Sequence, residues 1–372
     1  MSRRRLFTIL LVGVLVLVGG GLWLAKDRIQ DHLATTAMRQ IYAHALSGDP
    51  IAALPDGLHV GLCGSGAPMP DPTRAGPCVA VVAGKRLFVV DSGEGSVRKL
   101  SLMNLPPGRV SALFITHYHS DHIADLGELM LQHWGTSTGA GAARTPLPVY
   151  GPTGLDQVLA GFVAAYGLDE GYRVAHHGTK VMPPTGFGGV AHMFAVDRAG
   201  PDVVLIDEPE LKIIALPVDH RPVEPAVGYL FIYKGHRVLV SGDTAPSARL
   251  EADAKDADIL VHEALAPNLV AIQRQEAVKA GRTNLAAIFH DILSYHTSPE
   301  QAAGIAQRAG VRYLLLNHII PPLPSRALNN VFLGRARDIF HGPVRVGEDG
   351  DFLSLPTGSS DIRRTNRLRT FQ

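Results

Sequence analysis

The hydrophobic positions of the chain form one long apolar run followed by many short ones. Residues 6–25 carry no charge, and from residue 58 onward short apolar runs alternate with stretches of helical periodicity. Strands are predicted at 58–63, 78–82, 87–90, 112–116, 212–218, 226–233, 238–241, 259–261 and 313–316. Helices are predicted at 123–133, 155–165, 246–254, 264–280, 299–309 and 326–340. This alternation indicates an α/β layer structure in which helices cover the sheets.

The N-terminal run has the length and the flanks of a membrane-spanning helix. A helix over residues 6–25 is ~30 Å long, which matches the hydrocarbon core of a bilayer. Three arginines at 3–5 precede it and Trp23 lies near its far end, so the N-terminus is expected in the cytoplasm. We therefore expect residues 1–28 to be an uncleaved anchor in the inner (cytoplasmic) membrane, with the rest periplasmic or extracellular. The alternative is a signal peptide cut within the glycine triplet at 19–21.

The remainder of the chain divides into a stem, one large domain and a tail. Apolar residues at four-residue spacing between 29 and 45 predict a stem helix, which would pack on the globular part or on a second copy in a homodimer. Residues 29–56 are therefore assigned to stem and linker. Residues 57–357 are long enough for one domain with a substantial core. The polar, basic segment 358–372 is expected to be a mobile tail.

Charge and cysteine content narrow the functional classes. The chain has 35 basic and 34 acidic residues and a net charge of +1, so no basic excess indicates nucleic-acid binding. Cys63 and Cys78 are the two cysteines of the sequence. They are either two small buried residues on neighbouring strands or one disulfide, which requires an oxidising compartment.

Histidines and carboxylates follow directly on several predicted strands. Such groups are costly in a protein core unless they are paired or bound to a metal. Alternate side chains of an extended segment point the same way, so His117 and His119 can bind one cation together. Asp121 and His122 can then turn toward a second cation. Imidazoles and carboxylates suit Zn²⁺, with Mn²⁺ or Fe²⁺ as alternatives. Further candidates at strand ends are His220, Asp243, His262, Glu263 and His318.

The His-x-His-x-Asp-His motif at 117–122 resembles the signature of the metallo-β-lactamase superfamily. The resemblance extends over about residues 58–322 and follows the order of motifs in the ribonuclease Z-like branch. Its other matching segments are 64–68, 88–95, 220 with 228–229, 241–244, 262–264, 296–298 and 314–318. The resemblance implies a four-layer αββα sandwich, preceded here by one transmembrane helix.

Transferred position by position, the resemblance implies a centre with two divalent metal ions. It assigns one metal to His117, His119 and His220, the second to Asp121, His122 and His318, and a bridging role to Asp243. A bridging carboxylate suits two cations ~3.5–4 Å apart that acidify a shared water. Asp121 would also orient this water or accept its proton.

The resemblance also suggests groups that act beside the metals. His296 would be a general acid at the leaving oxygen, or would stabilise charge on the reacting group. The sequence at 297–300 predicts a helix start, whose positive end suits an anionic ester. His262 and Glu263 would orient the ligands, or else form an ordinary polar pair at a strand end. The adjacent histidines at 176–177 either line the substrate cleft or are solvated.

The expected substrate depends on what lies between the ligand motifs. Ribonuclease Z enzymes carry a Gly- and Lys-rich arm that grips transfer RNA, whereas residues 156–217 contain no comparable basic cluster. Residues 151–200, with the two prolines at 321–322, resemble exported arylsulfatase-type members of the branch instead. We therefore expect a hydrolase of small anionic esters, an aryl sulfate or a phosphodiester, with no nucleic-acid partner. The alternatives are a ribonuclease Z-like tRNA 3′-processing endonuclease, a lactonase and a non-catalytic metal-binding protein.

Overall fold

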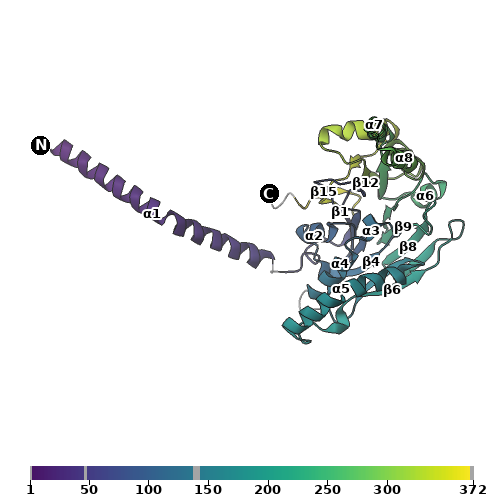
Figure 1. The fold of residues 1–372 in the computed structure, drawn as a ribbon, viewed down its shortest axis with the longest axis horizontal. Coiled ribbons are helices and arrows are strands. Elements are labelled where there is room, and N and C mark those ends of the chain that lie inside the picture. The colour runs from purple at the N-terminus through teal and green to yellow at the C-terminus, as the bar shows by residue number, and fades with distance from the viewer. Residues whose placement is uncertain (1, 46–47, 137–142, 369–372) are drawn as a thin grey trace. The chain divides into compact units, whose positions relative to one another are not determined.

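The chain forms two compact units in a computed structural model that describes residues 2–45, 48–136 and 143–368. The first unit is Met1–Asp49 and the second is Pro50–Gln372. The boundary therefore falls within the segment 29–56 that was expected to be stem and linker (Figure 1).

The first unit consists of one helix, α1 (Arg3–Ala45), which runs without a break through the expected anchor and stem. Within it, the segment Arg3–Gly21 has a mean hydropathy of 1.8 and is not buried against the rest of the protein. It is long and apolar enough to cross a membrane. A signal sequence has the same length and composition. The apolar side chains of the stem, among them Leu33 and Ile41, are exposed. Packing of this stripe on a second copy stays a prediction.

The second unit contains two β-sheets. The first sheet consists of β1 (Gly57–Gly64), β2 (Cys78–Ala83), β3 (Arg86–Val90), β4 (Val110–Phe114), β5 (Leu147–Pro152), β6 (Gly189–Phe194), β14 (Asp351–Pro356) and β15 (Arg363–Asn366). The second consists of β7 (Val203–Asp207), β8 (Leu211–Pro217), β9 (Val227–Tyr233), β10 (His236–Val240), β11 (Ile259–Leu265), β12 (Tyr313–Ile320) and β13 (Val344–Val346). Their orders are β15-β14-β1-β2-β3-β4-β5-β6 and β13-β12-β11-β10-β9-β8-β7.

Helices cover the outer faces of both sheets. The first sheet carries α2 (Ser96–Leu102), α3 (Ser120–Ile123), α4 (Leu126–Gly135) and α5 (Leu155–His177). The helices that follow the strands of the second sheet are α6 (Ala248–Asp253), α7 (Pro267–Lys279), α8 (Thr283–Asp291), α9 (Pro299–Arg308), α10 (Asn329–Leu333) and α11 (Ala336–Ile339). Figure 1 shows α4 and α5 on one side of the sandwich and α6 on the other.

Three apolar layers hold the sandwich together. Between the sheets, Phe88 and Phe114 of the first sheet pack on Phe231 of the second. Outside the first sheet, Leu129 of α4 belongs to a second buried cluster. Outside the second sheet, Ile305 of α9 belongs to a third. Burial of apolar surface is the main driving force for such layers. The predicted four-layer αββα sandwich is confirmed.

The structure differs from the predicted elements mainly at the edges of the sheets. The expected tail contains β15, whose residue Asn366 pairs with Asp351 of β14, so part of segment 358–372 is sheet and not a free tail. The expected helix 264–280 begins only at Pro267, because β11 continues to Leu265. The expected helix 326–340 is interrupted at Gly334, where φ is 52°.

Cys63 and Cys78 form a disulfide between β1 and β2, as the second interpretation of the two cysteines, one disulfide, proposed. Both residues are buried, and they lie 15 positions apart in the sequence. A loop of this size restricts the unfolded chain, and we expect replacement of both cysteines by alanine to lower the free energy of unfolding by about 3 kcal/mol. Urea denaturation of the oxidised protein and the double variant measures the difference. Equal midpoints and slopes would show that the disulfide contributes no stability.

Candidate metal centre

The predicted ligands lie together where strands of both sheets end. His117 and His119 follow β4, and Asp121 and His122 lie in the short helix α3 that comes next. Of the other three, His220 follows β8, Asp243 follows β10 and His318 lies within β12. The sequence therefore folds locally so that β4 is followed by four of the candidate ligands, while β8, β10 and β12 each present one, all at the same edge of the sandwich.

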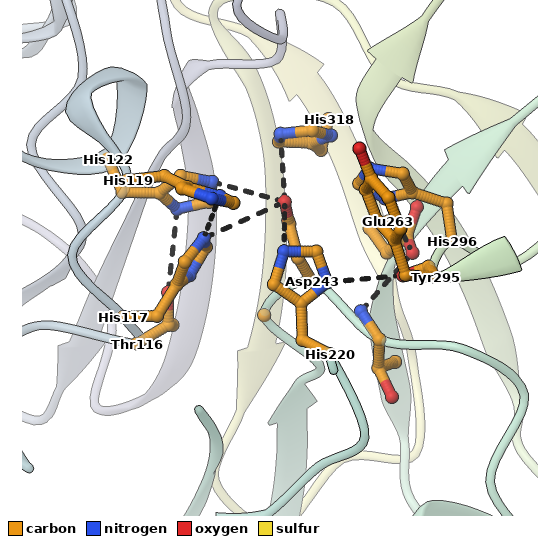
Figure 2. A network of polar contacts seen from close by, with 12 residues as sticks. Thr116, His117, His119, His122, His220, Asp243, Glu263, Tyr295, His296 and His318 are labelled. Atoms are coloured by element: carbon orange, nitrogen blue, oxygen red, sulfur yellow. Dashed lines mark hydrogen bonds and ion pairs between the residues drawn. The ribbon is translucent and has the colours of Figure 1, made fainter. Parts of the chain in front are cut away.

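The turn that presents Asp243 requires glycine at position 242. Gly242 has a φ of 62°, and an added Cβ would lie 2.6 Å from the carbonyl oxygen of Val227. A side chain at this position would therefore be strained and would collide with the backbone of β9. Asp243 itself is buried, and Figure 2 shows its carboxylate surrounded by imidazoles.

The candidate ligands form two clusters, in each of which all ligand atoms lie within 4.8 Å of one another. One cluster is His117, His119, His220 and Asp243, and the other is Asp121, His122 and His318. This division is the one that the resemblance to the metallo-β-lactamase superfamily implied. A cation in each cluster would have imidazole and carboxylate ligands, as Zn²⁺ sites do.

One oxygen of Asp243 faces both clusters. Its Oδ2 lies 3.2 Å from Nε2 of His318, 3.4 Å from Nε2 of His122, and 4.0 Å from Nε2 of both His117 and His220 (Figure 2). No other described carboxylate has this position between the two sets of imidazoles. The geometry suits a carboxylate shared between two cations.

Two of the ligand atoms make no hydrogen bond within the protein. Nε2 of His122 and Nε2 of His220 are buried without a hydrogen bond among the described residues. Nε2 of His117 lies 2.9 Å from Nδ1 of His119. Buried polar nitrogens are rarely left unsatisfied, and a cation accepts lone pairs from several at once. The residues present therefore fit a metal centre.

Burial keeps most of these imidazoles neutral. It lowers the pKa of His117 well below its usual value and that of His220 to about 4. Neutral imidazole is the form that binds a metal. Burial also disfavours the charged form of His122, but the carboxylates of Asp243 and Asp91 outweigh it and raise the pKa of His122.

Two residues outside the expected set orient ligands. Nδ1 of His122 donates a hydrogen bond of 2.8 Å to Oδ2 of Asp91, whose Oδ1 accepts the backbone N–H of Thr116 at 2.8 Å. Nδ1 of His220 donates to the carbonyl oxygen of Tyr295 at 3.1 Å. These bonds direct Nε2 of both rings toward the centre. Asp91 had a signal in the sequence, an acidic residue directly after a strand, whereas a backbone carbonyl has none.

His296 and Glu263 form a pair beside the ligands. Nδ1 of His296 donates to Oε1 of Glu263 at 3.2 Å, and the same oxygen accepts the N–H groups of Thr297 and Thr244 at 2.9 and 3.2 Å. The ring of His296 stacks on that of His318 with centroids 5.5 Å apart. Burial lowers the pKa of His296 and raises that of Glu263. Glu263 thus contacts a candidate catalytic group, as an orienting residue would.

The remaining expected histidines lie apart from the centre. His262 is buried, and its Nδ1 donates to the carbonyl oxygen of Glu263 at 2.8 Å. Among the described residues it makes no hydrogen bond to a ligand, so its geometry differs from that of Glu263. His176 and His177 are exposed in the last turn of α5, outside the pocket described below. The helix start expected at 297–300 is confirmed, with Ser298 capping α9.

A pocket of about 660 Å³ opens beside the centre. One end is formed by His119, Asp121, Asp243, His296 and His318. The rest of its wall is mostly apolar and comes from the segment 68–70, from α8 and the turn after it, and from the prolines that follow β12. The volume is in the range of pockets for small ligands. These segments lie far apart in the sequence, so the sequence alone did not predict this pocket.

Similarity to known proteins covers most of the second unit. The Metallo-beta-lactamase superfamily profile matches residues 71–290. Ribonuclease Z from Mycobacterium sp. (strain KMS) is 36% identical over 293 residues, which cover 78% of this chain and 94% of the relative. Ribonuclease Z from Mycolicibacterium paratuberculosis is 37% identical over 294 residues, which cover 78% of this chain and 96% of that relative.

Solved structures share the fold at lower identity. A metallo-β-lactamase fold protein from Bacillus subtilis has a TM-score of 0.55 and 20% identity, and covers 81% of this chain and 100% of its own. The short form of human tRNase Z has a TM-score of 0.54 and 22% identity, and the match covers 80% of this chain and 99% of the human chain. The expected superfamily and the expected enzyme class are confirmed. The chain belongs to the metallo-β-lactamase superfamily of metal-dependent hydrolases, and ribonuclease Z enzymes are among its relatives.

Proposed function

We propose that the chain hydrolyses phosphodiester bonds with two divalent metal ions held by the seven candidate ligands. The observation that carries the proposal is the position of Asp243 Oδ2, within 4.0 Å of four imidazole nitrogens from two clusters. Two such cations, when bound, would supply a hydroxide at neutral pH and neutralise charge on the reacting phosphoryl group. Zn²⁺ suits these ligands, with Mn²⁺ or Fe²⁺ as alternatives.

Asp121 and His296 are the residues that would move protons. Burial raises the pKa of Asp121, but the hydrogen bond from His318 and the nearby His122 outweigh it, and the net shift is downward. Asp121 is therefore ionised at neutral pH and can accept the proton of the attacking water. His296 lines the pocket with its Nδ1 held by Glu263, and a ring protonated at both nitrogens would donate from Nε2 to the departing oxygen and keep its hydrogen bond to Glu263.

Two substrate classes have support from different observations. The relatives named ribonuclease Z favour RNA, which speaks against the expectation of no nucleic-acid partner. The pocket favours a small ester, because no Lys or Arg is among its lining residues. Polyanion binding depends largely on such cations.

The proposal predicts metal-dependent cleavage of phosphodiesters in preference to other esters. We expect the metal-loaded protein to hydrolyse bis(4-nitrophenyl) phosphate faster than 4-nitrophenyl sulfate or an aryl lactone, a chelator to abolish the activity, and added Zn²⁺ or Mn²⁺ to restore it. Precursor transfer RNA is assayed in parallel at physiological salt. Accurate 3′-end cleavage at a higher kcat/KM than the small esters would assign RNA as the substrate. A protein with two metals that cleaves no phosphodiester would refute the proposal.

We also propose that α1 anchors the protein in the cytoplasmic membrane with the catalytic unit outside the cytoplasm. The apolar segment Arg3–Gly21 and the arginines before it support this topology, and so does the Cys63–Cys78 disulfide, since disulfides persist in oxidising compartments. A reporter that is active only outside the cytoplasm, fused after Gln372, should give signal, and the mature chain should retain Arg5. A mature N-terminus near residue 22 would refute the anchor, and a reporter active only in the cytoplasm would refute export.

A further inference from the structure

The pocket beside the metal centre has two chemically different ends. At one end lie Asp243, His296 and His318, where a phosphoryl group would react. The other end lies against the hairpin of α7 and α8, two helices that pack on each other and lie side by side in Figure 1. A ligand that fills the pocket therefore contacts the metal centre and this hairpin at the same time.

The hairpin end of the pocket is apolar and partly open to solvent. Phe289 and Ile292 are buried in its wall, whereas Leu285 and Ile288 of α8 are exposed at its rim, Ile288 by 53%. Met69 contributes to the wall from the loop after β1. Covering apolar side chains that are exposed to water favours binding in proportion to the area buried. The wall therefore suits an apolar group.

The pocket also lacks the charges that a nucleic-acid backbone needs. None of its lining residues is Lys or Arg, and apart from the residues of the metal centre its polar side chains are Gln273 and Tyr295. The adjacent pocket is lined by three cations, and each forms an ion pair with a carboxylate: Arg74 at 3.2 Å, Lys99 at 3.2 Å and Arg326 at 2.6 Å. A chain of phosphates leaving the centre through this pocket would meet no free cation there.

We infer that the substrate is a phosphodiester with an apolar ester group, an aryl ring or a hydrocarbon chain, that lies against α8. The inference rests on the proposed phosphodiester hydrolysis and names its substrate class. Water adds to phosphorus, the P–O bond to one ester group breaks, and the departing oxygen takes up a proton. The products are an alcohol, which departs beside His296, and a phosphomonoester, which keeps the apolar group against α8.

Substrates that share one leaving group test this inference. The full-length, metal-loaded protein is assayed with the 4-nitrophenyl phosphodiesters of methanol, hexanol, phenol and the 5′-hydroxyl of thymidine. We expect kcat/KM for the hexyl and phenyl esters to exceed that for the methyl ester by about 10-fold or more, mainly through KM, because more apolar area is buried. We also expect both to exceed the thymidine ester. A thymidine ester that is cleaved best would overturn the inference in favour of a nucleic-acid substrate.

Two isoleucines in the hairpin provide a matched pair of variants. Ile288 in α8 and Ile272 in α7 are 53% and 54% exposed, but only Ile288 lines the pocket. Ile288→Ser should lower kcat/KM for the hexyl ester by about 3- to 10-fold and leave the methyl ester unchanged. Ile272→Ser should change neither. An equal effect of Ile288→Ser on both esters, or an equal effect of the two variants, would contradict an apolar subsite on α8.

A binding measurement separates this inference from the proposed function. Calorimetry compares phenylphosphonate with methylphosphonate, neither of which is hydrolysed. Tighter binding of phenylphosphonate that Ile288→Ser reduces, in a protein that cleaves no ester, would retain the apolar subsite and refute phosphodiester hydrolysis. Phosphodiester cleavage with equal binding of the two phosphonates would refute the apolar subsite and retain phosphodiester hydrolysis.

Discussion

Asp243→Ala should remove at least one metal and abolish most of the activity. Its Oδ2 is the one described carboxylate oxygen that faces imidazoles of both clusters, at 3.2 Å from His318 and 4.0 Å from His117. Without it, two cations would lose their shared anion and would repel each other across the site. Loss of a group that only supports a metal ligand lowers metal affinity or activity by about 10–100-fold. Because Asp243 would itself be a ligand, we expect kcat/KM to fall by at least ~10²-fold. Elemental analysis and phosphodiester assays measure both effects.

Asp258→Ala is the matched control for this variant. Asp258 is also a buried aspartate, but it follows α6 and accepts the backbone N–H of Arg237 at 2.8 Å. Its loss should lower stability and leave both metals in place, since its partners lie outside both clusters of candidate ligands. An Asp243→Ala protein that keeps two metals and full turnover would show that the carboxylate is not shared between them.

His296→Ala should retain both metals and lower kcat by ~10²–10⁴-fold. His296 lines the pocket, and its orientation is fixed by Glu263, whose Oε1 also accepts two backbone N–H groups. The loss should be smaller for esters with a good leaving group, because such esters need little proton donation. Glu263→Gln keeps an acceptor oxygen and should cost less than removal of the imidazole.

Metal content decides between two roles for His296. Its ligand atom lies within 4.8 Å of those of Asp243 and His318, so the ring is near enough to a cation for ligation to be tested. Loss of a metal in His296→Ala would make the residue a ligand and not a proton donor. Equal losses for good and poor leaving groups, with both metals retained, would indicate stabilisation of charge on the phosphoryl group instead.

The strands that carry the ligands could be predicted because their signal is local. β4, β10 and β12 are buried along nearly their whole length and appear in the sequence as apolar runs that are followed by polar residues. The missed strands have weaker signals. β6 is an edge strand with several exposed residues, and β13 has three residues. β15 exists only through its pairing with β14, which no local pattern shows.

The site shows the same division between local and distant information. The motif at 117–122 is contiguous, so alternation of side chains already indicates which residues bind together. The pocket wall is not local, because Met69, Ile288 and Ile320 lie in separate segments that meet only in the folded chain. The helix that carries Ile288 was also missed, since α8 follows α7 after a short turn at Gly281. The resemblance therefore implied the full set of candidate ligands, whereas the shape of the pocket beside them had no signal in the sequence.

The most direct test of a two-metal hydrolase is a titration of metal into the full-length protein. The protein is first depleted with a chelator, and phosphodiester hydrolysis is then followed as Zn²⁺ or Mn²⁺ is added. Protein purified without a chelator is analysed for its metals alongside. We expect two equivalents per chain as purified and activity that rises until the second equivalent has bound. One equivalent or none in the untreated protein, or full activity after a single equivalent, would contradict the shared position of Asp243 between two cations.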